Sequence, residues 1–520
     1  MNKGIVISGI IGIIIITTVV ILVSSVSDIE KGEVEVLTGT PSDNYPEIDR
    51  DKFCGAGDAK STKYIKEYKI PTDCTQPLAI VTSPNGNVWF AQSNTGKLAK
   101  FNPLTESFTE YDNRFWPTGD RSMIWGLDYA SDGTLWFTDD THNSIWKFDI
   151  TTREYERVPF LLPENSLPQR LDVIGSRIII NDFTGNQIIY FDNIYSLDEL
   201  VTYSLPPPAQ NSVSADFTID LENNLWFTNW IPDQEGSLVK INQTKFDLAI
   251  QNNSEVIEFN FFPLPNDLST PNGISEDNSG NIWIADSSSS LFFKFDPISE
   301  NFTKYSTSDP PIFSYGNHTG QIKSSISQPY WIEKSPSGIV FNEPSANRIA
   351  VFDPTSETLV EYSIPSKNPY WGDCDNEKNC GISQVFDFTI DGDKIWFTEW
   401  AENKIGVLDT SILLPIDVQP DTNRISIKPG ESKDLYFVIS SISQSPIKVS
   451  PIFNNPDFEN NVNVTYNSNE NYLLNSDIPL EISISVSASE IATSGEYKIL
   501  LGVETDLISF SKFVTVTIEE

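Results

Sequence analysis

The sequence predicts an all-β protein, a seven-bladed β-propeller followed by an immunoglobulin-like β-sandwich, with one N-terminal transmembrane helix. Three observations predict it: a short apolar phrase recurs seven times, strand-like stretches without that phrase follow, and an uncharged apolar segment opens the chain. The expected organisation is a membrane anchor over residues 4–27, a linker over 28–60, the propeller over 61–411 and the sandwich over 412–520.

The composition limits the possible functions. The 520 residues carry 34 Lys and Arg against 72 Asp and Glu, a formal net charge of −38. The chain therefore has no basic face for phosphates, and we expect no nucleic-acid partner. With 39% hydrophobic and 12% aromatic residues, it is too apolar for a disordered acidic protein. Its two histidines, His142 and His318, argue against a multi-histidine metal site.

The N-terminal segment indicates the compartment. From Gly4 to Ser27 the chain has no charged residue, and as a helix it would be about 36 Å long, enough to cross the ~30 Å hydrocarbon core. Lys3 precedes the segment and several acidic residues follow it, so the positive-inside rule predicts a single-pass cell-membrane protein with most of the chain outside. A cleaved signal peptide is the alternative, and in both cases the body is exported.

Four cysteines fit an oxidising exterior: Cys54, Cys74, Cys374 and Cys380. Four cysteines allow three pairings, and the sequence alone does not choose among them. We expect Cys54–Cys74 and Cys374–Cys380, because both pairs close short loops. A zinc site is disfavoured, since no C-x-x-C pair is present and no histidine stands near.

The apolar phrase marks seven repeats. Its copies lie 43 to 57 residues apart, and turn residues separate the strand-like stretches around each copy. Alternating apolar and polar residues predict antiparallel strands, four to a repeat, which is typical of β-propeller blades. The copies are VWFAQ (88–92), LWFTD (135–139), IIIND (178–182), LWFTN (225–229), IWIAD (282–286), IVFNE (339–343) and IWFTE (395–399).

The seventh repeat lacks an outer strand after residues 404–410. The stretch at 63–71, KYIKEYKIP, resembles the outer-strand stretch LVEYSIP of the sixth repeat. We therefore predict that the N-terminal stretch completes the last blade and closes the ring, which protects the strand edges of an open array. The strand-like stretches after residue 411 predict the sandwich, as a stalk or packing module beside the propeller.

The phrase WFTEWAENKIGVLD (396–409), with LWFTD, LWFTN and PNGISEDNSGNIWIAD (271–286), resembles the virginiamycin B (streptogramin) lyase family of seven-bladed propellers. PNGI followed by IADS also resembles the wider gluconolactonase-type propellers. The resemblance covers roughly residues 62–411. It implies histidines in P-H-x-I phrases and neighbouring carboxylates that together hold a divalent cation.

The positions that correspond to those histidines carry none here. Glu399 matches the family's glutamate in WFTEW, but Gln92 stands where the next blade would offer a glutamate. The resemblance therefore supports the fold and argues against the lyase reaction. The histidine positions are occupied by Leu78, Trp125, Gln169, Ala215, Asn272, Tyr330 and Phe386.

The last residues of the seven phrases, the phrase-end residues, are expected to form a ring on one face. Five of them are carboxylates, which suit Ca²⁺ or Mg²⁺. The alternative is that each acid caps the turn that follows it. If the face is catalytic, Glu343 and Glu399 are the candidates. The phrase-end residues are Gln92, Asp139, Asp182, Asn229, Asp286, Glu343 and Glu399.

Aromatic residues are expected beside this ring. Such a rim could bind a sugar, a peptide or an organic cation, or simply pack the mouth of the channel. The predicted ligand-binding residues are Gln92, Trp125, Asn272, Tyr330, Phe386 and Trp400, and Trp230 is a further member of the rim.

Three functional classes remain. The first, which we adopt, is a membrane-anchored, outward-facing recognition or scaffold protein that binds a small molecule, a glycan or a protein, with a divalent cation on its acidic face as one means. The second is a cation-dependent lyase or lactone hydrolase that uses the carboxylate ring. The third is a structural role in a surface layer.

Overall fold

The computed structural model describes most of the chain after residue 40 and a short segment before it. The described residues are 22–25, 41–116, 121–159, 166–185, 187–205, 212–231, 236–251, 257–310, 326–372, 374, 380–454, 461–466, 471–476 and 478–519. His318 lies outside them, as does most of the expected anchor at 4–27.

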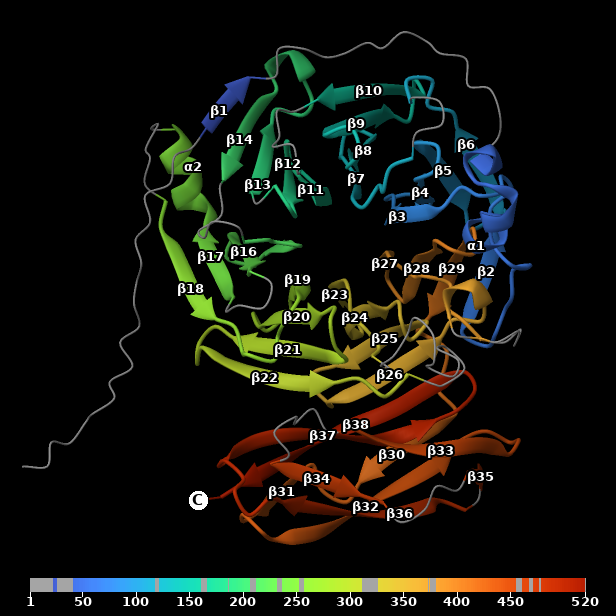
Figure 1. Ribbon diagram of the computed structural model, residues 1–520, viewed down its shortest axis with the longest axis vertical. Coiled ribbons are helices and arrows are strands. Elements are labelled where there is room, and N and C mark those ends of the chain that lie inside the picture. The colour runs from blue at the N-terminus through green and yellow to red at the C-terminus, as the bar shows by residue number, and fades with distance from the viewer. Residues whose placement is uncertain are drawn as a thin grey trace, which may run out of the picture.

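The protein is all-β, with seven antiparallel sheets arranged in a ring in the described part of the chain (Figure 1). Each sheet has its first strand toward the centre and its fourth at the rim, which is the arrangement of a β-propeller. The first four sheets contain β3 (Pro77–Thr82), β4 (Val88–Gln92), β5 (Lys97–Asn102) and β6 (Ser107–Tyr111); β7 (Leu127–Tyr129), β8 (Thr134–Asp139), β9 (Ser144–Asp149) and β10 (Glu154–Pro159); β11 (Pro168–Ile174), β12 (Arg177–Asp182), β13 (Gln187–Asp192) and β14 (Val201–Leu205); and β15 (Phe217–Ile219), β16 (Asn224–Asn229), β17 (Ser237–Asn242) and β18 (Phe259–Pro263).

The remaining three sheets follow the same order along the chain. They contain β19 (Pro271–Glu276), β20 (Ile282–Asp286), β21 (Leu291–Asp296) and β22 (Asn301–Ser306); β23 (Ile332–Ser335), β24 (Gly338–Glu343), β25 (Arg348–Asp353) and β26 (Thr358–Ser363); and β27 (Phe388–Asp391), β28 (Lys394–Glu399), β29 (Lys404–Asp409) and β2 (Ile65–Lys69). Helix α2 (Gln243–Gln251) connects β17 to β18, and a 3₁₀ helix (Leu197–Glu199) precedes β14.

The apolar phrases form the second strand of each sheet because their large side chains fill the space between neighbouring sheets. Trp89, Trp136, Trp226 and Trp283 are buried, each within an apolar cluster. The tight turn between the second and third strands needs a left-handed residue, which glycine and asparagine adopt most easily. That residue is Gly96, Asn143, Asn347 and Asn403 in four of the sheets, each with positive φ.

The last sheet is completed by a strand from the other end of the propeller. β2 pairs antiparallel with β29, from Ile65 opposite Leu408 to Lys69 opposite Lys404. β2 thereby covers the edge of β29 that the seventh repeat would otherwise leave unpaired. The cysteines pair as expected, Cys54 with Cys74 and Cys374 with Cys380.

The C-terminal residues form two sheets that pack face to face. One has the order β30-β32-β36-β34, and the other contains β35, β33, β37 and β38, with β31 parallel to β38. Buried apolar side chains of both sheets share one core. The strands are β30 (Ile416–Pro420), β31 (Arg424–Ile427), β32 (Ser432–Ser441), β33 (Ile447–Asn454), β34 (Val462–Thr465), β35 (Tyr472–Leu474), β36 (Leu480–Ala488), β37 (Gly495–Glu504) and β38 (Ile508–Ile518).

This sandwich continues a propeller sheet. β38 pairs antiparallel with β26, from Thr358 opposite Lys512 to Tyr362 opposite Ile508, so that one sheet runs through both units (Figure 1). Phe513 of β38 also enters an apolar cluster with Phe292, Tyr305 and Phe352 of the propeller. The sandwich is therefore anchored by both backbone hydrogen bonds and side-chain packing.

Two expectations concern the N-terminal region. Of the predicted anchor helix, the described residues Leu22–Ser25 form the strand β1, which pairs with β14; β-branched residues such as its valine favour extended backbone. In the described part of the chain, no helix has the length and apolarity needed to cross a membrane. The described part of the expected linker, 41–60, packs against the propeller through the 3₁₀ helices Pro41–Asn44 and Glu47–Asp49 and the helix α1 (Arg50–Phe53).

Candidate functional site

The phrase-end residues stand at the last position of the second strand in each sheet. All seven are buried, with at most 5% of any residue exposed. Six of them are hydrogen-bonded within or beside their own sheets, and Glu399 has no side-chain hydrogen-bond partner among the described residues.

Three of the carboxylates cap turns, as the alternative interpretation expects. Asp139 accepts hydrogen bonds from the backbone nitrogen of His142 (3.2 Å) and from Nε1 of Trp146 (2.9 Å). Asp182 accepts from the backbone nitrogens of Leu167 (2.8 Å) and Gly185 (2.9 Å). Asp286 accepts from Thr270 N (2.8 Å) and Ser288 N (3.2 Å). Backbone donors of the same blade therefore use these oxygens.

Glu343 takes part in an ion pair. Its two carboxylate oxygens accept hydrogen bonds from Nε (3.0 Å) and Nη2 (3.1 Å) of Arg348, which is fully buried. The same Nη2 lies 3.0 Å from Oε1 of Glu361. Burial raises the pKa of Glu361, and the Arg348 guanidinium opposes that rise. The position of Glu343 is structural rather than catalytic.

Glu399 lies in a buried cluster at the ring closure, together with Glu67 of β2, Glu402 and Lys404. Nζ of Lys404 contacts Glu402 (2.9 Å) and Ser366 Oγ (2.7 Å), and lies 3.9 Å from Glu67. Neither carboxylate oxygen of Glu399 has a hydrogen-bond partner among the described residues. Burial raises the pKa of Glu399 well above its usual value, and the carboxylates of Glu67 and Glu402 raise it further against the effect of Lys404.

Replacing Glu399 by glutamine is therefore expected to stabilise the fold at neutral pH. Because the folded-state pKa is raised, wild-type stability falls as pH rises from the unfolded-state value of 4.5 toward the raised pKa, with a slope of up to about 1.4 kcal/mol per pH unit. Glutamine does not ionise, so the variant lacks this decline. Urea unfolding between about pH 5 and 8 should show a gap that widens with pH. The exposed Glu490→Gln is the control, and a gap independent of pH would contradict the interpretation.

The expected cation site does not fit the structure. The carboxylates predicted to hold Ca²⁺ or Mg²⁺ are occupied by turn donors at Asp139, Asp182 and Asp286 and by Arg348 at Glu343. The neighbours of Glu399 are Lys404 and the two carboxylates, Glu67 and Glu402, that Lys404 pairs with. Among the described residues, no group of three or more His, Cys, Asp or Glu side chains is arranged to hold a metal ion. A hard cation needs several converging oxygens, and the phrase-end residues do not provide them.

Four of the predicted ligand-binding residues do come together. The rings of Trp125 and Phe386 lie 5.7 Å apart, that of Tyr330 lies 6.4 Å and 6.3 Å from them, and Trp400 lies 5.8 Å from Phe386. We call these four residues the aromatic mouth; three of them precede inner strands, and Trp400 follows β28. Asn272 interacts with Tyr330, whose pKa burial raises to about 12.

Two other predicted members lie elsewhere. Gln92 donates to Glu110 on the outer strand of its own sheet (2.9 Å). Trp230 packs on Phe183, with 6.0 Å between the ring centres.

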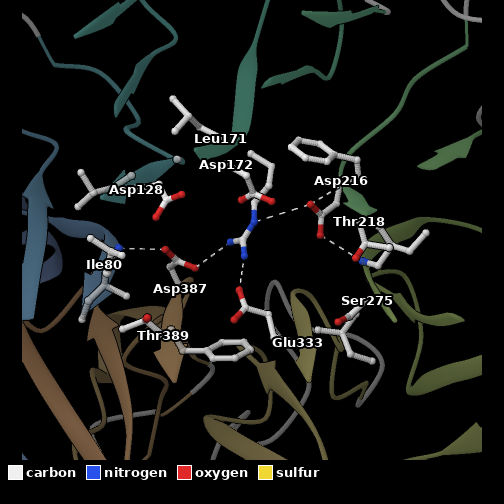
Figure 2. Close-up of a pocket in the computed structure, with 18 of the residues that line it drawn as sticks. Ile80, Asp128, Leu171, Asp172, Asp216, Thr218, Ser275, Glu333, Asp387 and Thr389 are labelled. Carbon is white, nitrogen blue, oxygen red and sulfur yellow. Dashed lines mark hydrogen bonds and ion pairs between the residues drawn. The ribbon is translucent and has the colours of Figure 1, made fainter. Parts of the chain in front are cut away.

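The central channel contains a cavity that the sequence did not reveal. It has a volume of about 300 Å³ and is lined by the inner strands of all seven sheets. Figure 2 shows carboxylates that point into it from several sheets, and Arg170 belongs to the same lining. The acidic residues of the lining are Asp128, Asp172, Asp216, Glu333 and Asp387.

Arg170 contacts three of these acids across the channel. It forms an ion pair with Glu333, its Nη1 lies 3.5 Å from Asp387, and its Nε lies 3.7 Å from Asp216. Arg170, Asp216 and Asp387 occupy equivalent places in their sheets. Each lies one residue before the inner-strand residue that pairs with the third residue of the phrase. The ring brings them together although 217 residues separate Arg170 from Asp387.

Three aspartates also tie neighbouring sheets together. Asp128 accepts from Val173 N (2.7 Å), Asp216 from Ile274 N (3.1 Å) and Asp387 from Ile80 N (3.0 Å). Asp172 differs, because no hydrogen bond to its carboxylate is found within the described part of the chain. Burial raises the pKa of Asp172, and the guanidinium of Arg170 opposes that rise.

Burial and mutual repulsion make it difficult for all the carboxyl groups of this cavity to ionise together. Burial and the neighbouring Asp172 raise the pKa of Asp128 to about 7. Burial raises the pKa of Asp216 to about 8 and that of Asp387 to about 7, with Arg170 opposing both rises. The raised pKa values mean that the protonated forms of these groups are favoured more than those of exposed aspartates. In the sequence these acids look like ordinary strand residues; only their common place in the repeat could have indicated that they meet.

Comparison with known proteins agrees with this fold. The model of the virginiamycin B lyase family matches residues 55–292. Solved structures of the same kind match at TM-scores near the threshold for a shared fold: selenomethionine-substituted virginiamycin B lyase from Staphylococcus aureus (TM-score 0.50, 21% identity, 68% of this chain and 99% of that one) and its catalytically inactive variant with quinupristin (0.51, 20%, 68% and 99%). A streptogramin B lyase gives 0.50 at 21% identity, over 66% of this chain and 97% of that one.

These likenesses establish the fold alone. No curated protein matches the chain. The resemblance to the virginiamycin B lyase family that the repeats carry is thereby confirmed over residues 55–292, which the model of that family matches.

Proposed function

We propose that this protein is an exported ligand-recognition protein that binds a small organic cation in the cavity of its propeller channel. The observation that carries the proposal is the charge of that cavity. Five carboxylates line it, and a single guanidinium, that of Arg170, lies among them. Lys334 stands at the exposed end and faces Glu276 instead, at 3.9 Å.

An organic cation suits the site better than a metal ion. The acids come from different sheets and do not converge as a metal shell would. A volume of about 300 Å³ is at the lower end of small-molecule sites. An amine or guanidinium has hydrogen-bond donors that spread over several carboxylates, and the low dielectric of the channel strengthens each contact. Asp172 supplies an acceptor that no hydrogen bond of the described chain uses.

Calorimetric titration of the full chain with agmatine and putrescine tests this proposal. We expect binding to tighten from about pH 6 to 8, because Asp128, Asp216 and Asp387 lose the protons that compete with the cation. Protons released on binding should make the observed heat depend on the ionisation enthalpy of the buffer. A heat that is the same in all buffers, or binding that weakens over this range, would contradict the proposal.

Asp172→Asn is expected to weaken the binding of either cation at least tenfold, a loss of about 1.4 kcal/mol. The matched control is Asp393→Asn, because Asp393 lies on the exposed turn that follows the inner strand β27. Glutamate serves as the anionic control ligand. Equal affinity in Asp172→Asn and wild type would remove Asp172 from the site, and no binding of either cation would overturn the function.

The membrane anchor and outward orientation belong to this proposal as well. The uncharged segment at 4–27 and the two disulfides support them. Protease treatment of intact cells should digest the propeller if it faces outward.

The family match favours a second candidate, a cation-dependent lyase or hydrolase. The solved relatives include a lyase variant with quinupristin. Incubation of the chain with quinupristin and Mg²⁺ tests it, because ring opening of the compound, lost on chelation, would favour the enzyme over the binding protein. We expect no ring opening, because most carboxylates at the phrase ends are already hydrogen-bonded within the protein.

A further inference from the structure

A segment before the propeller lies over the aromatic mouth. We call residues 41–57 the strap; it comprises two 3₁₀ helices, α1 and Cys54, which is bonded to Cys74. Phe53 of the strap packs on the apolar cluster that contains Leu78, Trp125, Phe386 and Trp400. In Figure 1, α1 lies beside β2 and β29, near the junction that closes the ring.

Phe53 occupies a seat made of aromatic rings. Its ring lies 5.8 Å from Trp371 and 5.8 Å from Trp400, in edge-to-face geometry with both. Tyr45 stacks on the other side of Phe53 at 4.8 Å. Edge-to-face and stacked pairs at these distances are favourable beyond simple area burial. One phenyl ring therefore fills a site built from Trp371 and Trp400.

Polar contacts hold the strap in register. Nε1 of Trp371 donates to the carbonyl of Lys52 (2.8 Å), and the backbone nitrogen of Ala56 donates to Oε1 of Glu402 (3.1 Å). At the other end, Nδ2 of Asn44 donates to Oδ1 of Asn94 (2.8 Å). These contacts reach the first and the last sheets, so the strap bridges the same junction that β2 closes.

The strap leaves one polar group of this aromatic site without a hydrogen bond. Only 8% of Trp400 is exposed, yet its Nε1 has no hydrogen-bond partner among the described residues. A buried indole N–H usually finds an acceptor, because leaving it unpaired costs free energy. Phe53 offers a ring but no acceptor.

The geometry points to the strap being an intramolecular cap: Phe53 fills a ring-binding site of the aromatic mouth, and release of the strap opens that site to an aromatic ligand that carries a hydrogen-bond acceptor. The Cys54–Cys74 bond ties the strap to the segment just before β3, so reduction loosens the cap. This site is separate from the acidic cavity, which lies further along the inner strands.

Hydrogen exchange of the full chain measures the cap. In Phe53→Ala, amide exchange within residues 383–388 and 399–403, which carry Phe386 and Trp400, is expected to rise at least tenfold over wild type. N-acetyl-phenylalaninamide, which has a phenyl ring and amide carbonyls, should restore the protection in the variant and have no effect on wild type. The matched control is Ile48→Ala, an exposed residue of the same strap, for which no change is expected.

Two results would overturn the inference. One is exchange in Phe53→Ala equal to that in wild type; the other is increased exchange that the probe does not reverse. If Phe53→Ala does not fold, Cys54→Ser with Cys74→Ser gives the same readout, with the cap loosened and the phenyl ring kept. Agmatine binding should be unchanged in all these variants, so failure of the cap and failure of the cation site are distinguished.

Discussion

Arg348→Met is expected to lower the free energy of unfolding by about 3–5 kcal/mol. Arg348 lies between Glu343 and Glu361, all three fully buried, and also donates to Oγ (2.7 Å) and the carbonyl (3.0 Å) of Ser308. Methionine fills a similar volume but leaves two buried carboxylates without a cation. Removing one partner of a buried ion pair costs far more than the pair itself contributes.

Urea unfolding at neutral pH measures this loss. Arg424→Met is the matched control, because Arg424 also pairs with a glutamate, Glu496, but at the surface, where such pairs contribute little. Adding Glu343→Gln and Glu361→Gln to Arg348→Met should restore much of the stability by removing both stranded charges. A loss in Arg348→Met no larger than that in the control would show that water or protonation compensates the two carboxylates.

Phe513→Ala is expected to lower the free energy of unfolding by about 3–5 kcal/mol as well. The side chain is buried in an aromatic cluster, with ring centres 5.0 Å from Tyr305 and 5.7 Å from Phe352. Because Phe513 belongs to the sandwich and its partners to the propeller, the cavity left behind weakens the contact between the two units.

The expected signature is a change from one unfolding transition to two, with the sandwich unfolding first. Tyr436→Ala, on a partly exposed position of the sandwich, is the control for the loss of an aromatic residue away from the contact. A single transition shifted by less than about 1 kcal/mol would mean that the backbone pairing of β26 with β38 alone holds the sandwich in place.

Much of the fold could be predicted from the sequence because each phrase carries the apolar pattern of a buried strand. A tryptophan, isoleucine or valine stands at the same place in the seven phrases, and each is buried, Trp136 and Trp283 among them. The seventh repeat lacks an outer strand, and a stretch of the outer-strand kind stands before the first repeat. Together these two observations predict the ring closure. Local spacing favoured the cysteine pairs that the structure contains, because each closes a short loop.

The site was less accessible to sequence reasoning. An acid at the end of a strand suits a metal site and a turn cap equally well. Asp139 is a cap because the backbone nitrogen of His142, in the turn that follows, donates to it. Arg170 and Asp387 lie on strands far apart in sequence, and their contact exists only in the closed ring. The pairing of β38 with β26 likewise depends on how two units dock, which no periodicity records.

The position of β2 between Cys54 and Cys74 has a consequence for proteolysis. The strand that fastens the ring lies inside a covalent loop, since both the residues before it and those after it are joined through sulfur. A protease that cuts the exposed backbone near residue 58 would produce two polypeptides that migrate as one until a reductant is added. The propeller ring would stay closed after the cut, and the N-terminal piece would remain attached to it.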